Sequence, residues 1–272
     1  MTSRIAFPAL FALLCASSTA ALAAGPDNLD IGDAMLRPAS STTKEIGIGV
    51  AVAPPYVGAY NHKTYGYVDV EANFGNGLFV SSKNGFGYRF LETPSGWSMA
   101  TSLSASPSRR EKDAASDPVN RMNGMGDVNA KVQANLFLNY DNGPFHANAA
   151  LGQTLAARRG TQLDLSVGYD LFADPNNLVR ATAGMVYANR NLMQTFYGVT
   201  PQQAARSGNW VYSPHAGIAA LDVGVNWRHA FSEHWVGDVG VGAARLHGDA
   251  LDSPMRALRN GVAVEASLSY RF

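Results

Sequence analysis

The sequence predicts an all-β fold, namely a transmembrane, antiparallel, up-and-down β-barrel of about 12 strands, with ten strands as the alternative. Three observations predict it. Apolar and polar residues alternate with period two through much of the chain, as they do in strands with one apolar face, although a soluble secreted β protein, which alternates in the same way, is the alternative. Many of these segments run for about 10–14 residues, which is long enough to cross a bilayer with tilt. The chain also ends on such a segment, with an aromatic residue, Phe272.

The first 23 residues have the pattern of a secretory signal peptide. Arg4 precedes an apolar run over residues 5–14, and Ala-Leu-Ala at 21–23 forms a small-residue cleavage site. We therefore predict that residues 1–23 are removed. The only cysteine, Cys15, lies in this segment, so we expect a mature chain without disulfides or thiolate metal ligands.

The mature chain divides into two parts. Residues 24–42 show no periodicity and are predicted to be a flexible periplasmic lead-in, whereas residues 43–272 form the predicted outer-membrane barrel. The formal net charge is zero and only 15% of residues are charged, which argues against a nucleic-acid partner. No apolar run after the signal peptide approaches the length of a transmembrane helix, so a membrane-spanning mature chain would have to be a closed barrel.

The alternating segments place the strands in order. The clearest ones lie at residues 45–52, 127–140, 162–171, 220–229 and 261–272. In residues 78–93, two short strands around Asn84-Gly85 are predicted, and one long irregular strand is the alternative that would give the lower strand count. Aromatic residues gather at strand ends, where the interface girdles of a barrel would lie.

Breaks between the segments predict the topology. Long breaks occur near residues 55–63, 107–126, 191–213 and 248–259, and short Gly-, Asn- and Pro-containing turns separate the other segments. If Phe272 is at the periplasmic end, all four long breaks fall on the external side, which is where such barrels carry their long loops.

The longest predicted external loop, 191–213, contains a short helix. Thr200 is the expected N-cap, Pro201 occupies the first helical position, Gln203 completes a capping box and Gly208 ends the helix. Such caps are sufficient structural reasons for these residues. We therefore expect the helix to be a structural plug in the barrel mouth, with direct ligand contact as the alternative.

Charged residues on the polar strand faces are predicted to point into the lumen. Both signs occur in similar numbers, so we expect them to pair across a narrow barrel and to fill it, with an open diffusion pore as the alternative. These residues are Lys131, Asp164, Asp170, Arg180, Asp222, Arg228, Asp238, Glu265 and Arg271.

Two stretches resemble a known family. FYGVTPQQAARSG at residues 196–208 and RLHGDALDSP at 245–254, followed by a terminal YRF, are similar to the MltA-interacting protein (MipA) / OmpV family of Gram-negative outer-membrane proteins. The motif residues are Tyr197, Gly198, Val199, Thr200, Ala204, Ser207, Gly208, Gly248, Asp249, Ala250, Asp252, Ser253 and Pro254. Tyr270 and Phe272 form the expected signal for the barrel-assembly machinery.

The resemblance implies an integral outer-membrane barrel in a Gram-negative cell. For the family's namesake it also implies a scaffold that joins a murein lytic transglycosylase to a murein synthase, while other relatives are described as adhesins, osmotically regulated proteins or antibiotic-linked proteins. The leading hypothesis is therefore a non-enzymatic scaffold of peptidoglycan assembly and turnover. The alternative is a narrow channel or a surface receptor or adhesin.

Catalytic and cofactor chemistry find little support in the sequence. His247, Asp249 and Asp252 could activate water as a rim hydrolase, although a turn capped by the two aspartates is the favoured interpretation. The six histidines lack metal-ligand spacing, so no metal or cofactor is expected. Basic residues in loop 107–126 could bind lipopolysaccharide phosphates, but a solvated loop of mixed charge is the simpler interpretation.

Overall fold

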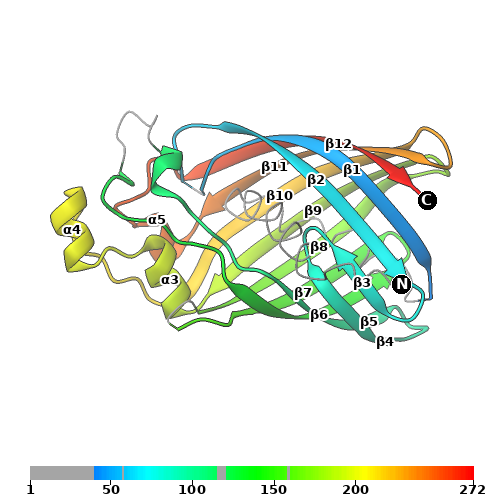
Figure 1. The fold of residues 1–272 in the computed structure, drawn as a ribbon, viewed down its shortest axis with the longest axis horizontal. Helices are drawn as coiled ribbons and strands as arrows, with labels where there is room; N and C mark the ends of the chain where they lie inside the picture. The colour runs from blue at the N-terminus through cyan, green and yellow to red at the C-terminus, as the bar shows by residue number, and fades with distance from the viewer. Residues whose placement is uncertain (1–39, 57, 115–120, 158–159) are drawn as a thin grey trace, which may run out of the picture.

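The computed structural model describes residues 40–56, 58–114, 121–157 and 160–272. The predicted signal peptide at 1–23 and almost all of the predicted lead-in at 24–42 lie outside the described residues. Within the described part, the chain forms a closed barrel of twelve strands, as the sequence predicts (Figure 1). The strands are β1 (Thr42–Ala53), β2 (Lys63–Phe74), β3 (Leu78–Ser81), β4 (Gly85–Glu92), β5 (Trp97–Ala105), β6 (Val132–Asn142), β7 (Phe145–Thr154), β8 (Thr161–Ala173), β9 (Asn177–Ala188), β10 (Gly217–Ala230), β11 (Trp235–Leu246) and β12 (Asn260–Arg271).

The barrel closes between its first and last strands. All strands pair antiparallel with their neighbours along the chain, and β1 pairs with β12 in a register that runs from Glu45↔Arg271 to Val52↔Val264. The amide of the terminal Phe272 continues this pairing by donating to the carbonyl of Lys44 over 2.9 Å. Closure pairs the first strand with the last, as a strand structure surrounded by lipid requires, although β2 pairs with the short strand β3 only over residues 71–73.

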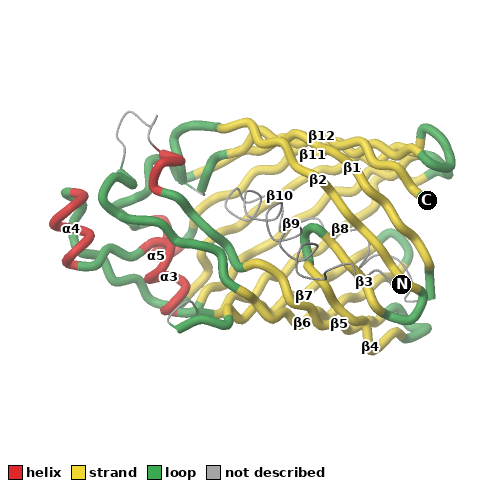
Figure 2. Tube along the Cα trace, viewed as in Figure 1, coloured by secondary structure: helices red, strands yellow, loops and turns green. Residues whose placement is uncertain are grey.

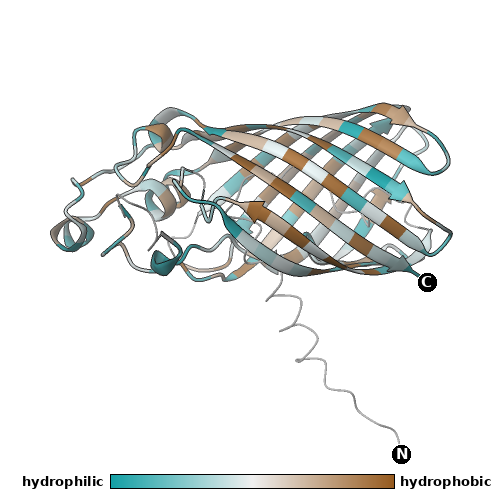
Figure 3. Ribbon diagram, turned by 90° about the horizontal axis from the view of Figure 1, so that it is seen from above, coloured by the Kyte–Doolittle hydropathy of each residue, from teal (hydrophilic) through white to brown (hydrophobic). Residues whose placement is uncertain are grey.

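The two faces of the barrel wall differ as the alternation predicts. Along β1, the outward-facing side chains of Ile46 and Ile48 are 47% and 70% exposed. The Glu45 side chain, which faces the lumen, is only 7% exposed. Brown and teal residues alternate along the strands in Figure 3. The apolar outer face suits acyl chains, and the polar side chains are directed inward.

Two details concern the irregular parts of the wall. The two short strands β3 and β4 form around Asn84-Gly85 as predicted, and Gly85 has a φ of 78°, a conformation that favours glycine.

The prediction for β6 is wrong at its start, since the strand begins at Val132 rather than at residue 127. Val128 instead pairs with Arg109 in an isolated bridge within a loop.

The connections differ sharply between the two ends of the barrel. One end, called the turn end below, carries only short connections and the C-terminus, and the other, the loop end, carries the long loops and the helices (Figure 2). The helices there are α3 (Arg190–Tyr197), α4 (Pro201–Ser207), α5 (Gly248–Leu251) and the 3₁₀ turn η2 (Glu111–Ala114). Among the described residues, no helix has the length and apolarity needed to span a membrane.

Candidate functional site: the loop cap and its cavity

Four loops fold together over the loop end of the barrel. We call this assembly the loop cap, and it comprises the described residues of 54–62, 106–131, 189–216 and 247–259. Its centre is a cluster of buried apolar side chains, to which every one of the four loops contributes. The cluster consists of Tyr56, Ala59, Met122, Met125, Val199 and Met255. The cap is thus a packed layer and not a set of separate loops.

The predicted short helix is α4, and its caps are those the sequence predicts. The Thr200 side chain accepts from the amide of Gln203, the Gln203 side chain accepts from the amide of Thr200, and Gly208 takes the left-handed conformation with φ 74°. The same Gln203 side chain donates to the carbonyl of Met125 over 2.8 Å. Asn209 donates to the carbonyl of Arg121, also over 2.8 Å. These bonds attach α4 to the neighbouring loop, which supports a structural role. The prediction that this helix plugs the barrel mouth is wrong, because α4 has no buried residue and lies at the outer edge of the loop cap, farthest from the barrel (Figure 1).

A second helix, α3, was not predicted. Asn189 is its N-cap, with the side chain accepting from the amide of Leu192 over 3.0 Å. Leu192 and Met193 are buried against the barrel mouth, and Phe196 and Tyr197 pack beside them. The signal was present as an Asn cap followed by apolar residues at helical spacing. The longer strand alternation on either side obscured it.

The two family-like stretches interlock in the loop cap. The Ser253 hydroxyl donates to the carbonyl of Tyr197 over 2.7 Å. The Tyr212 hydroxyl donates to the carbonyl of Asp249 over 2.7 Å, and the amide of His215 donates to the Asp249 carboxylate over 2.7 Å. Ser253 and Tyr197 thus join the two stretches directly, whereas Tyr212 and His215, which follow the first stretch, bind Asp249 of the second.

The remaining motif residues have ordinary structural positions. Gly198 is the C-cap of α3, and Gly248 opens α5 with φ 51°. Ala250 and Pro254 are buried. The Ser207 hydroxyl accepts from the amide of Asn209 over 3.2 Å.

In the described structure, no side-chain hydrogen bond or ion pair joins the three predicted rim hydrolase residues to one another. The Asp249 carboxylate is occupied by the backbone amide and the imidazole of His215, the latter at 2.9 Å, and these bonds hold the pKa of Asp249 below its usual value. Asp252 is the exposed C-cap of α5, and His247 is exposed at its N-cap. The described residues also contain no group of His, Cys, Asp and Glu side chains that could hold a metal ion.

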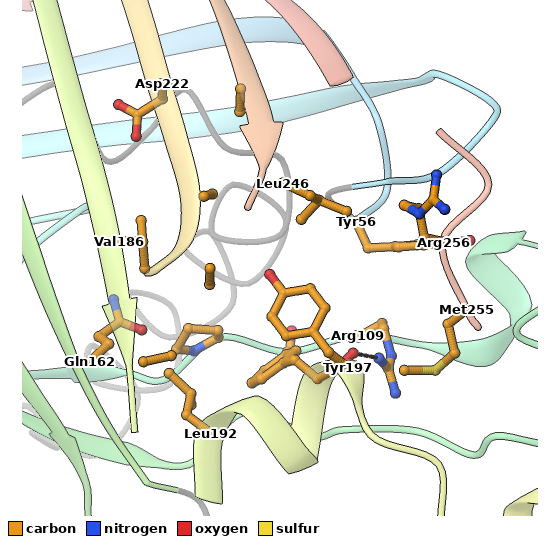
Figure 4. A pocket seen from close by; sticks show the side chains of 17 residues that line it. Tyr56, Arg109, Gln162, Val186, Leu192, Tyr197, Asp222, Leu246, Met255 and Arg256 are labelled. Atoms are coloured by element: carbon orange, nitrogen blue, oxygen red, sulfur yellow. Dashed lines mark hydrogen bonds between the residues drawn. The ribbon is translucent and has the colours of Figure 1, made fainter. Parts of the chain in front are cut away.

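A cavity of about 100 Å³ lies between the loop cap and the barrel interior. Figure 4 shows side chains from α3, from the barrel wall and from the loops around it. Most of its lining is apolar, with Val186, Leu192, Leu246 and Met255 among the contributors. The polar exceptions lie on different sides, with Arg109 and Arg256 toward the cap and Gln162 and Asp222 on the barrel strands.

Arg109 is the most buried cation of this lining. It is 4% exposed, donates to the carbonyl of Phe196 and lies 5.9 Å from the centre of the Phe196 ring. Burial lowers the pKa of Arg109 to about 10, so the guanidinium stays charged at neutral pH. Its Nε atom has no hydrogen-bond partner within the described structure. The interpretation of loop 107–126 as merely solvated is therefore wrong for Arg109.

The strand side of the cavity carries a buried acid. Asp222 of β10 is 6% exposed, and its Oδ1 atom finds no hydrogen-bond partner among the described residues. Gln162 of β8 is engaged beside it, donating to the Asp164 carboxylate over 2.7 Å. The sequence placed Asp222 and Asp164 in the lumen correctly but gave no sign that Asp222 would lack a partner.

The turn end of the lumen has the opposite character. Glu45 accepts from Arg271 over 2.6 Å and from Arg228 over 2.7 Å, and Arg228 also lies 3.3 Å from Asp238. These contacts cross between β1, β10, β11 and β12. The prediction that luminal charges pair across the barrel is confirmed for this group.

A second paired group lies on β7, β8 and β9. Asp170 accepts from Arg180 over 2.6 Å, and the His146 ring lies between Asp170 at 3.0 Å and Asp141 at 2.6 Å. Two of the predicted luminal charges, Asp170 and Arg180, thus bind one another. Lys131 precedes β6 and is exposed at the loop end.

Comparison with known proteins adds a family and several similar folds. The sequence model of the family described as MltA-interacting protein MipA matches residues 46–272. No match was found among curated proteins. Among solved structures, the chain resembles an outer-membrane channel from Pseudomonas putida F1, with 11% identity, a TM-score of 0.46 and coverage of 90% of this chain and 100% of that one. It also resembles the KdgM porin, with 11% identity, a TM-score of 0.45 and coverage of 84% and 99%.

Proposed function

Because the chain belongs to the MltA-interacting protein (MipA) family of integral outer-membrane barrels, we propose that it is a non-enzymatic scaffold for murein assembly and turnover. The proposed partners are a murein lytic transglycosylase and a murein synthase. The observation that carries the proposal is the paired group around Glu45, because ion pairs that occupy the lumen favour a surface role over transport. Outer-membrane lipid and the barrel-assembly machinery are further expected partners.

The topology supports a partner surface at the turn end. Bacterial barrels keep short turns in the periplasm and long loops outside, so the turn end is the periplasmic one. Murein enzymes act on that side. We therefore assign the contact to the short turns around Ser95, Asn176 and Glu233, together with the lead-in at 24–42. The loop cap, which holds the family-like motifs, lies on the other side.

Site-specific crosslinking in intact cells tests this assignment. A photoreactive residue is placed at Ser95 or Glu233 of the turn end, and a matched one at Ser213, which is exposed in the loop cap. We expect adducts with a murein transglycosylase or synthase from the first two positions and none from the third. Adducts only from Ser213, or no murein enzyme at either turn, would contradict scaffolding through the turn end.

One observation favours the alternative function of a narrow channel or a surface receptor or adhesin. The cavity beneath the loop cap provides a partly open space at the loop end of the barrel. Planar-bilayer recording of the purified protein separates the two functions. A scaffold with a filled lumen gives a silent bilayer, whereas steady conductance would favour the channel.

A further inference from the structure

The cavity beneath the loop cap combines three chemical surfaces. Its cap side carries the guanidinium groups of Arg109 and Arg256, its middle is apolar, and its strand side carries the Asp222 carboxylate. The labelled side chains of Asp222 and Arg109 lie at opposite ends of the cavity in Figure 4. Neither arginine forms an ion pair with an acidic side chain of the described residues.

Each of these three polar groups has one buried atom without a hydrogen-bond partner in the described structure. The Nε atoms of Arg109 and Arg256 and the Oδ1 atom of Asp222 are buried without hydrogen-bond partners in the described structure. An unpaired buried polar atom costs free energy, and the large majority of such atoms in folded proteins are paired. Three of them around one cavity suggest that a molecule inside it supplies the missing partners.

We propose that this cavity binds a small amphipathic carboxylate that carries a hydrogen-bond donor at its other end, such as a short ω-amino acid. The carboxylate lies against Arg109 and Arg256, the aliphatic chain lies along Leu192 and Leu246, and the donor reaches Asp222. This proposal is independent of the scaffold function, because the cavity faces the loop end and the scaffold uses the turn end.

Charge and geometry favour a carboxylate at the cap side. A guanidinium offers several N–H donors in a planar fork that matches a carboxylate, and such charge-assisted bonds are among the strongest in proteins. Arg109 remains protonated at neutral pH even though burial lowers its pKa to about 10. At the strand side, an ionised Asp222 carboxylate offers acceptors and no donor, which selects a ligand with an N–H or O–H group there.

The volume limits the size of the ligand. The cavity measures about 100 Å³, whereas sites for drug-sized molecules usually span roughly 300–1,000 Å³. An apolar cavity on the order of 150 Å³ can hold benzene. A chain of a few carbons between the two polar ends therefore fits, and an oligosaccharide or a peptide does not.

Calorimetric titration of the detergent-solubilised full-length protein tests the proposal with three matched probes. They are 5-aminovalerate, with both polar groups, valerate, which lacks the amine, and pentylamine, which lacks the carboxylate. We expect 5-aminovalerate to bind best, valerate to bind about tenfold more weakly, and pentylamine to bind worst, because loss of a charge-assisted bond typically costs tenfold or more in affinity.

Variants assign each end of the ligand. Arg256→Gln should weaken both carboxylates about tenfold, whereas Arg259→Gln on the same loop, where the side chain is exposed, should change nothing. Asp222→Ala should remove the preference for 5-aminovalerate over valerate. Arg109→Lys is the second test of the cap side, since it keeps the charge but loses the fork. Heat-modifiable gel migration confirms that each variant is a folded barrel.

Two outcomes would overturn the proposal. One is the absence of binding by all three probes at millimolar concentration. The other is binding that is unchanged in Arg256→Gln and Arg109→Lys, because the ligand would then lie elsewhere. A crosslinking result at the turn end has no bearing on either outcome, so failure of this inference and failure of the scaffold proposal are distinguishable.

Discussion

The two ends of the lumen differ in whether their buried charged side chains are paired. At the turn end, the Glu45 carboxylate is bound by two arginines, at 2.7 and 2.6 Å. Beneath the loop cap, Arg109 and Asp222 line one cavity but keep unpartnered atoms. A buried charge that is paired can hold strands in place, whereas one left unpaired is a cost to the fold. The ion pairs at the turn end therefore stabilise the closure of the barrel. The unpartnered atoms at the cap end destabilise the fold and are the better candidates for binding a ligand.

Breaking the paired group should have the largest effect. In Glu45→Gln, Arg228 and Arg271 lose the carboxylate that they share, and two cations remain in the lumen wall. We expect a loss of about 3 kcal/mol in the free energy of unfolding, which is the scale seen when one partner of a buried pair is removed. Urea unfolding from lipid vesicles measures it. Glu233→Gln, at an exposed turn residue, is the control and should be neutral. Equal stability of both variants would remove the structural role of the group.

Removing the unpaired acid should have the opposite sign. In Asp222→Leu, a buried carboxylate with an unpartnered oxygen is replaced by an apolar side chain among Ala220, Ala244 and Leu246. We expect a gain of about 1 kcal/mol, because replacement of an unsatisfied buried polar group by an apolar one tends to stabilise a fold.

Asp238→Leu is the matched comparison, since that aspartate also faces the lumen but pairs with Arg228. The same substitution there should destabilise the barrel in the same unfolding assay. If both aspartate variants shifted stability in the same direction, the distinction between the two ends of the lumen would fail.

The barrel wall was predictable from the sequence because strands that cross a membrane require a simple pattern of alternating apolar and polar residues. Period two along β1 and β12, the strand lengths and the closing aromatic residue are all local features, and lipid outside leaves few other folds. The capped helix α4 was equally local, since Thr200 and Gln203 suffice for its capping box. The alternation gave a wrong prediction at Val128, where an isolated bridge to Arg109 within a loop replaces the predicted strand pairing.

The cavity was not predictable in the same way. Arg109 stands in a loop of mixed charge, where the default expectation is a solvated side chain. Its burial arises from α3 and from Met255, which reach it from distant parts of the chain. Likewise, Asp222 was assigned to the lumen, but the missing partner of its Oδ1 atom depends on which side chains the other strands and loops place around it. Whether a buried charged side chain finds a hydrogen-bond partner depends on the tertiary structure, and the spacing of residues along the sequence does not determine it.

The loop cap should also respond to acid, with a smaller and local effect. The backbone amide and the imidazole of His215 hold the pKa of Asp249 below the value of about 3.9 that it has in an unfolded chain. A lowered pKa means that the contact contributes stability above about pH 4 and that this contribution is lost as the pH falls through the folded-state pKa.

Hydrogen exchange of the His215 amide measures this contact. Protection should be constant above about pH 4, after correction for the intrinsic exchange rate, and should fall below it as Asp249 is protonated. Asp249→Asn should remove the acid dependence, while Asp252→Asn, at the exposed end of α5, should keep it. Because the Asp249 side chain is partly exposed, solvent screens the interaction and the barrel strands should keep their protection throughout. Loss of protection in β1 and β12 over the same pH range would instead mean that acid acts on the Glu45 group, and that the turn end is the weaker of the two regions.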